Sequence, residues 1–204
     1  MKKIISLLLC FALVISLAGC GKSDNPDENG NNNTATLDIA ADLQAGKIPE
    51  LPISLGCNVN DARNTLSALE EIPEGAEPEE GYTYYTTKIS GDTVRLGCEG
   101  NFYYYNESKS SSGISAMATF TKAYGFTIGL EMLSDITGAI VQKGTVYSPT
   151  ADDLYFVFGE PDLSKYQAVY YTAGDMRLDF IFYDSYLSAV VISNTKLWNS
   201  SSAK

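Results

Sequence analysis

Three consecutive strand patterns near the end of the chain constrain its fold more than any other feature. Short turns separate them, and they cover residues 167–172, 177–183 and 186–193. In the middle segment Leu178, Phe180 and Phe182 alternate with other residues, so these three side chains share one face of a strand. The pattern predicts an antiparallel sheet that is packed on one face.

Helix patterns with capping residues at their starts lie among further strand patterns. The helix patterns cover 60–72, 134–141 and 150–158, and the additional strand patterns cover 82–89, 93–96, 102–105 and 114–121. The third helix pattern opens with Thr150 and Asp153 at capping-box spacing, although 154–158 is also compatible with a buried strand. These elements predict an α+β fold.

The two halves of this region share short sequence patterns. Ile53-Ser54-Leu55-Gly56, before the first helix, is echoed 73 residues later by Phe126-Thr127-Ile128-Gly129. Gly91-Asp92 is echoed by Gly174-Asp175 at a larger offset, which requires an insertion. We expect two related helix-plus-antiparallel-sheet units, about 50–121 and 122–199, in one body. Chance similarity between turn-rich β sequences is the alternative.

The N-terminus has the pattern of an export signal. Lys2 and Lys3 precede an apolar run, and residues 4–19 are too few for the roughly 20 residues of a spanning helix. The run ends in Leu17-Ala18-Gly19-Cys20, which resembles the lipobox of bacterial lipoproteins. The resemblance implies a signal peptide at 1–19, removed before Cys20, and acyl chains such as palmitate on Cys20. The alternative is an ordinary secretory signal in which Cys20 is incidental.

This resemblance implies a protein anchored by lipid to the extracytoplasmic face of the cell membrane. Residues 20–49 are then the lipidated cysteine and a flexible linker, since 21–34 are rich in Asn, Gly and Asp. Removing Lys2 and Lys3 changes the formal charge from −11 to −13. Such an acidic chain is not expected to bind nucleic acid, because phosphate binding requires a Lys/Arg surface.

Two cysteines remain after the signal and the lipidated residue are set aside. In an exported chain an even pair predicts a disulfide, here Cys57–Cys98, and two buried free thiols are the alternative. The chain has no histidine and no C-x-x-C motif, so a redox-active thiol is not expected.

Tyrosine is the residue type that suggests a binding surface. All 14 tyrosines lie between residues 82 and 186. Consecutive residues of a strand point to opposite faces, so the run 103–105 should expose some rings. We expect a binding face that includes Tyr82, Tyr84, Tyr103 and Tyr105. The alternative is that tyrosine is common here because it suits strands.

Catalytic and metal-binding patterns are weak. The absence of histidine excludes Ser-His-Asp and Cys-His chemistry. The Glu-rich segment 70–80 lacks the spacing of a calcium loop, and the carboxylate pairs Asp152-Asp153 and Glu160/Asp162 have no context that would raise a pKa. No phosphate-binding glycine loop is present. We expect no enzyme activity, no metal and no cofactor.

The body of the chain also resembles the β-lactamase-inhibitor-protein-like fold in two tandem copies. The residues that carry this resemblance are the two helix entries, 53–56 and 126–129, and Phe158-Gly159-Glu160-Pro161-Asp162 before the closing strands. In that family the concave face of the sheet commonly binds another protein. The resemblance therefore implies partner binding without naming the partner.

These observations predict an extracytoplasmic lipoprotein that serves as a non-catalytic binding module for a protein or an envelope polymer. One alternative is a small solute-binding component of a transporter, although the folded part is short for a two-lobed clamshell. An envelope hydrolase is a further alternative, disfavoured by the missing histidine.

Overall fold

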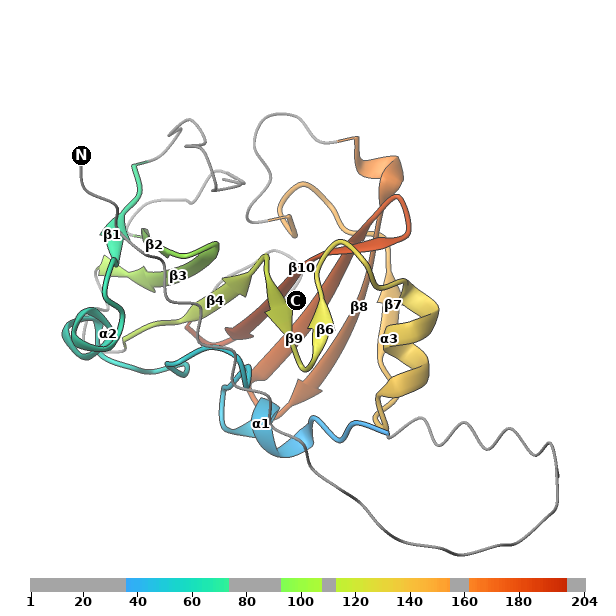
Figure 1. Cartoon of the computed structure of the whole chain (residues 1–204), viewed down its shortest axis with the longest axis horizontal. Helices are drawn as coiled ribbons and strands as arrows, with labels where there is room; N and C mark the ends of the chain where they lie inside the picture. The colour runs from blue at the N-terminus through green and yellow to red at the C-terminus, as the bar shows by residue number, and fades with distance from the viewer. Residues whose placement is uncertain (1–35, 74–92, 108–112, 155–161, 198–204) are drawn as a thin grey trace, which may run out of the picture. The chain divides into compact units, whose positions relative to one another are not determined.

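The strands of the described residues form one dominant eight-stranded antiparallel sheet and a small two-stranded one (Figure 1). The computed structural model describes residues 36–73, 93–107, 113–154 and 162–197. The strands lie in the spatial order β1-β2-β3-β4-β10-β9-β8-β7. The described residues belong to one compact unit, Thr34–Lys204.

Within the described residues, two successive sets of elements build the sheet, and each set is a short helix followed by four strands. The first set is α2 (Val59–Thr65), β1 (Glu70–Glu71), β2 (Thr93–Cys98), β3 (Asn101–Asn106) and β4 (Ala116–Thr119). The second set is α3 (Leu133–Ala139), β7 (Thr145–Tyr147), β8 (Tyr166–Ala173), β9 (Met176–Tyr183) and β10 (Tyr186–Asn194). The sets meet where β10 pairs with β4, from Val190 opposite Thr119 to Ser193 opposite Ala116.

The connections between strands correct one of the sequence correspondences. Gly174-Asp175 joins β8 to β9, whereas Glu99-Gly100 joins β2 to β3 in the first set. Gly91-Asp92 lies before β2 in the chain and is therefore not the counterpart of Gly174-Asp175. Corresponding elements of the two sets are separated by a nearly constant number of residues, since α3 begins 74 residues after α2 and β8 begins 73 residues after β2.

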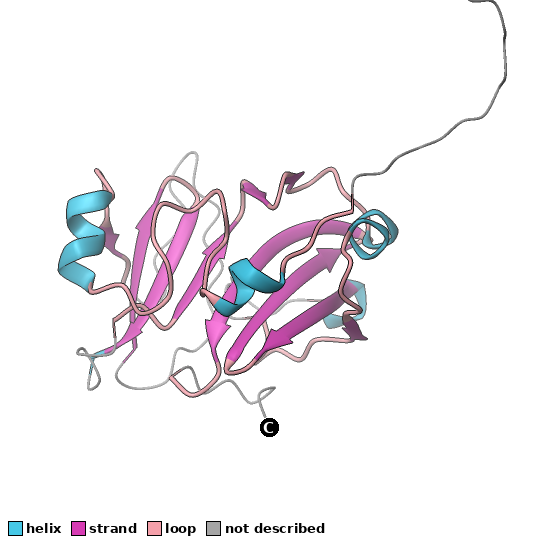
Figure 2. Ribbon diagram, turned by 90° about the horizontal axis from the view of Figure 1, so that it is seen from below, coloured by secondary structure: helices cyan, strands magenta, loops and turns pink. Residues whose placement is uncertain are grey.

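The prediction of an α+β fold is wrong, because the protein is mostly β. The helices of the described residues, α1 (Ala40–Gln44), α2 and α3, have 5, 7 and 7 residues, and Figure 2 shows them as short segments beside long strands. α2 ends at Thr65, well before Pro73, because Leu66 already has an extended backbone. Residues 151–153 form a turn rather than a helix, Thr150 and Leu154 are not helical either, and residues 155–158 of the third predicted helix lie outside the described residues.

The main core covers one face of the sheet, here called the first face. Leu178, Phe180 and Phe182 of β9 lie on it, as their alternation predicted, and are fully buried. Tyr124 and Phe126, from the hairpin β5 (Lys122–Ala123) and β6 (Phe126–Thr127), place their rings 6.2 and 6.1 Å from that of Phe180. This packing joins the central hairpin to the C-terminal strands.

The folded unit begins earlier than the sequence indicated. Ile39, Leu43 and Ile48 are buried in the same core, so the predicted linker 20–49 is wrong at its C-terminal end. α1 contacts β8 and β9, and the amide of Leu37 donates to the carbonyl of Ala139 at 2.8 Å. The signal peptide, Cys20 and the segment up to residue 35 lie outside the described residues.

The opposite face of the sheet, here called the second face, is also covered at its centre. Phe102, Tyr104 and Ala118 are at most 1% exposed there, and Leu154 and Ile72 pack against this second cluster. The expectation of a sheet packed on one face is therefore wrong.

None of the helices in the described ranges is long and apolar enough to cross a bilayer.

Candidate functional site

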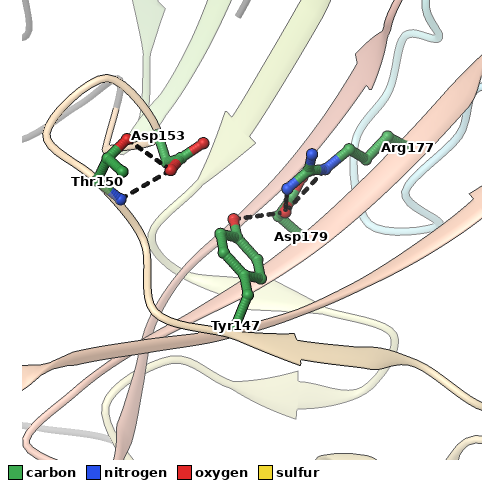
Figure 3. A network of polar contacts seen from close by, with 5 residues as sticks. All are labelled: Tyr147, Thr150, Asp153, Arg177 and Asp179. Carbon is green, nitrogen blue, oxygen red and sulfur yellow. Dashed lines mark hydrogen bonds and ion pairs between the residues drawn. The ribbon is translucent and has the colours of Figure 1, made fainter. Parts of the chain in front are cut away.

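A buried ion pair lies on the second face of β9 (Figure 3). Arg177 and Asp179 are two residues apart, so both side chains project from the same face of the strand. Arg177 Nη2 lies 2.7 Å from Asp179 Oδ1, and Arg177 Nε lies 2.9 Å from Asp179 Oδ2. The two-point geometry is the strong form of an Arg–carboxylate contact.

Two tyrosine rings enclose the guanidinium. Arg177 Cζ lies 4.4 Å from the ring centroid of Tyr170 and 5.2 Å from that of Tyr147. Tyr170 of β8 stands opposite Asp179, and the hydroxyl of Tyr147 on β7 donates to Asp179 Oδ1 at 2.8 Å. Cation–π contact and hydrogen bonding thus tie β7, β8 and β9 together.

Asp153 adds a second carboxylate beside this pair. Its Oδ2 accepts from the amide of Thr150, as the capping-box spacing predicted, and also from the hydroxyl of Thr150, both at 2.7 Å. Its Oδ1 is buried and has no hydrogen-bond partner among the described residues. Asp153, Arg177 and Asp179 together carry two carboxylates and one guanidinium.

Burial sets the protonation behaviour of the network. Burial raises the pKa of Asp179 above its usual range, although Arg177 and the Tyr147 hydroxyl act against that rise. Burial, followed by the charge of Asp179, raises the pKa of Tyr147. Arg177, Asp179 and the Tyr147 hydroxyl are hydrogen-bonded to one another, which links β7 to β9.

Three tyrosines cross one end of the second face, of which Tyr183 and Tyr186 are exposed and Tyr166 is half-buried. Tyr183 of β9 stands opposite Tyr166 of β8 on one side and opposite Tyr186 of β10 on the other. Residues directly opposite in antiparallel strands share a face, so the three side chains lie side by side. Met132 bridges to Tyr186 and extends the row, and Tyr183, Tyr186 and Met132 are 38%, 49% and 41% exposed. We call these four residues the tyrosine row.

The β9–β10 turn creates this row. Asp184 and Ser185 both have positive φ, 49° and 74°, as in the two-residue turns that match the twist of a hairpin. The turn was expected from the sequence, and it places the tyrosines on its two sides opposite each other. The sequence Tyr183-Asp184-Ser185-Tyr186 therefore indicates a pair of tyrosines facing each other across a turn, although the binding face expected from the sequence did not include them.

The predicted tyrosine face is only partly represented. Tyr103 is fully buried in the main core, so it offers no surface, and that expectation is wrong for this residue. Tyr105 is half-buried on the same face of β3, and Tyr82 and Tyr84 lie outside the described residues. Tyr103 is covered because the first face is packed where the run 103–105 crosses it.

The other predicted positions have mixed outcomes. Cys57 is half-buried, Cys98 is buried, and both are free thiols, so the predicted disulfide is not formed in this structure. Glu70 and Glu71 form the exposed edge strand β1. No group of three or more His, Cys, Asp or Glu able to hold a metal ion occurs within the described ranges.

Comparison with known proteins provides no family for this chain. No protein-family model, no curated protein and no solved structure matches it.

Proposed function

We propose that the chain is a lipid-anchored lipoprotein that acts outside the cytoplasm as a non-catalytic binding module. The observation that carries the proposal is Leu17-Ala18-Gly19-Cys20 at the end of a short apolar run with two lysines before it. Diacylation of Cys20 would provide stable anchoring, because one acyl chain alone holds a protein to a bilayer only marginally.

The position of the folded unit supports an anchored arrangement. Its first described contact is made by Leu37, so about fifteen residues separate it from Cys20. From the Asn, Gly and Asp content of residues 21–34 we propose a flexible tether, which at that length would span roughly 20 Å. That distance exceeds the Debye length of about 8 Å at physiological salt, so the acidic unit would sit beyond most of the repulsion from an anionic surface.

The described side chains favour binding over catalysis. Arg177, Asp179 and the half-buried Tyr147 are hydrogen-bonded to one another, and the tyrosine row presents the amphipathic rings of Tyr183 and Tyr186 to solvent. Exposed tyrosines supply contact area at low cost in side-chain entropy, which is a property of protein-binding surfaces.

Metabolic labelling with an alkyne analogue of palmitate tests the anchor. We expect the wild-type protein to take up label and to stay in the membrane fraction, whereas Cys20→Ser should lose the label and leave that fraction. Cys57→Ser is the matched control and should behave as wild type, because Cys57 lies in the folded unit. Retention of label and membrane location by Cys20→Ser would contradict the proposal.

A further inference from the structure

The tyrosine row has a carboxylate-rich rim in which one lysine is already held. Lys165, at the end of the short 3-10 helix Leu163–Lys165, places its ammonium 5.5 Å from the ring centroid of Tyr183 and 3.6 Å from Asp184 Oδ2. Tyr183, followed by Asp184, raises the pKa of Lys165, so the amine stays charged. The protein thus shows a cation seated on this surface.

The carboxylates around the row outnumber that one lysine. Asp184 lies in the turn between Tyr183 and Tyr186, and Asp162 caps the 3-10 helix by accepting from the amide of Ser164. Asp135 accepts from the amide of Met132 at 3.0 Å, at the other end of the row. Three carboxylates against one ammonium leave the rim negative, which adds to the attraction of aromatic faces for cations.

A second basic side chain on the same face of the sheet also contacts both tyrosine rings and a carboxylate. Arg177 lies over the rings of Tyr170 and Tyr147 and pairs with Asp179. A tyrosine ring combined with a carboxylate therefore holds a basic side chain twice on the second face. One of these pairs is buried, and the other, at Lys165, is partly open to solvent.

We infer that the tyrosine row is a docking surface for a protein segment that carries lysine or arginine. The inference rests on the proposed function, and it adds the place and the chemistry of the partner. Charge complementarity selects this occupant, because both the rim and the whole chain, at −11, are acidic. The three tyrosines on neighbouring strands and Met132, which bridges to Tyr186, span roughly 14 Å, which matches four or five extended residues.

Lys165 acts as an internal competitor in this arrangement. An incoming lysine or arginine takes the positions near Tyr183 and Asp184 that Lys165 fills, so removing Lys165 makes room for it. This leads to an unusual expectation, because the loss of a surface residue should strengthen binding.

The test uses the full chain, purified in a non-ionic detergent, and a fluorescent oligolysine peptide whose anisotropy reports binding at physiological ionic strength. We expect Tyr183→Ala/Tyr186→Ala to weaken binding by about tenfold. We expect Lys165→Met to strengthen it by about threefold. Circular dichroism confirms that each variant is folded before its affinity is compared.

Two matched controls separate this site from general attraction to an acidic protein. Lys196→Met removes a lysine from an exposed ion pair with Asp175, which lies outside the tyrosine row, and Tyr105→Ala removes a half-buried tyrosine from the first face. Neither should change the affinity by as much as about twofold. Equal strengthening by Lys165→Met and Lys196→Met, or an unchanged affinity in the tyrosine variant, would overturn the inference.

An uncharged oligosaccharide provides the competing outcome. If it binds through Tyr183 and Tyr186 while oligolysine does not, the surface recognises an envelope polymer and the inference is wrong. These results are independent of palmitate labelling, so the docking-surface inference can be refuted while the proposal of an anchored lipoprotein is kept. Loss of label from wild type would instead contradict the proposed function.

Discussion

Arg177 and Asp179 form a two-point ion pair from positions two residues apart on β9, with contacts of 2.7 and 2.9 Å. Both side chains are less than a tenth exposed. The pair occupies the second face of the sheet among Tyr147, Tyr170 and Asp153, where Arg177 acts against the rise that burial causes in the pKa of Asp179.

Replacing Asp179 with Asn should destabilise the protein strongly. The change leaves the Arg177 guanidinium buried beside a neutral amide, and breaking a buried pair in this way costs about 3 kcal/mol. Asp175→Asn is the matched control, since it removes an exposed ion pair with Lys196 that is worth less than about 1 kcal/mol. Urea unfolding of both variants measures the difference in the free energy of unfolding. Equal losses of stability would show that the buried ion pair contributes no more than the exposed one.

The same tyrosine-to-phenylalanine change should have opposite effects at two positions. The hydroxyl of Tyr103 is buried with no hydrogen-bond partner among the described residues, so Tyr103→Phe should stabilise the protein by about 1 kcal/mol. The hydroxyl of Tyr147 donates to Asp179, so Tyr147→Phe should destabilise it by about 1 to 2 kcal/mol. Thermal unfolding of the two variants in parallel checks the sign, and a loss of stability in both would contradict the placement of Tyr103.

Alkaline pH should unfold the protein through its buried tyrosines. Burial is the first cause that raises the pKa of Tyr103, Tyr124 and Tyr147. Above about pH 10 the unfolded chain loses these protons while the folded state keeps them, so ionisation favours unfolding and stability falls as pH rises. Each of the three contributes about 1.4 kcal/mol per pH unit in that window.

Urea midpoints measured on both sides of pH 10 test this slope. Tyr103→Phe removes one titrating group and should make the decline shallower. A midpoint that does not move in alkali would show that these tyrosines are not protected in the folded state.

Gly113 should tolerate alanine far less than Gly129 does. Both have positive φ, 68° and 93°, which costs an alanine about 1 to 2 kcal/mol. A Cβ on Gly113 would also meet the carbonyl oxygens of Cys57 and of Gly56, the latter at 2.6 Å, whereas a Cβ on Gly129 meets nothing within 4 Å. In chemical denaturation the free energy of unfolding should be clearly lower for Gly113→Ala than for Gly129→Ala. Similar losses of stability in the two variants would mean that the loop at Cys57 moves away freely.

Local patterns were sufficient for the C-terminal meander. The ends of β8, β9 and β10 lie within one residue of the predicted strands, and the turn at Asp184-Ser185 is where the sequence placed it. These elements depend on neighbours in the chain: alternation decides the face, and a two-residue turn decides which residues stand opposite. The pairing of Tyr183 with Tyr186 follows from the same two facts.

Those local patterns did not predict which side chains are buried. Ile39 and Leu43 lie in a stretch that resembled a linker, and they enter the core because α1 packs on β8 and β9. Tyr103 and Tyr104 point to opposite faces, as alternation requires, yet both are buried because each face is covered at that point. The lipid attachment at Cys20 stays a prediction, since that residue lies outside the described ranges.

The amino-acid sequence by itself determined which side chains share a strand face and where the hairpin at Asp184-Ser185 turns, because both depend on the geometry of adjacent residues. Only the tertiary structure decided that Arg177 and Asp179 are enclosed by Tyr147 and Tyr170 while Tyr183 and Tyr186 remain open to solvent. Whether a face is covered depends on residues far away in the chain, such as Ile72 and Leu154. The periodicity of a strand's own sequence does not predict that such distant residues pack against it.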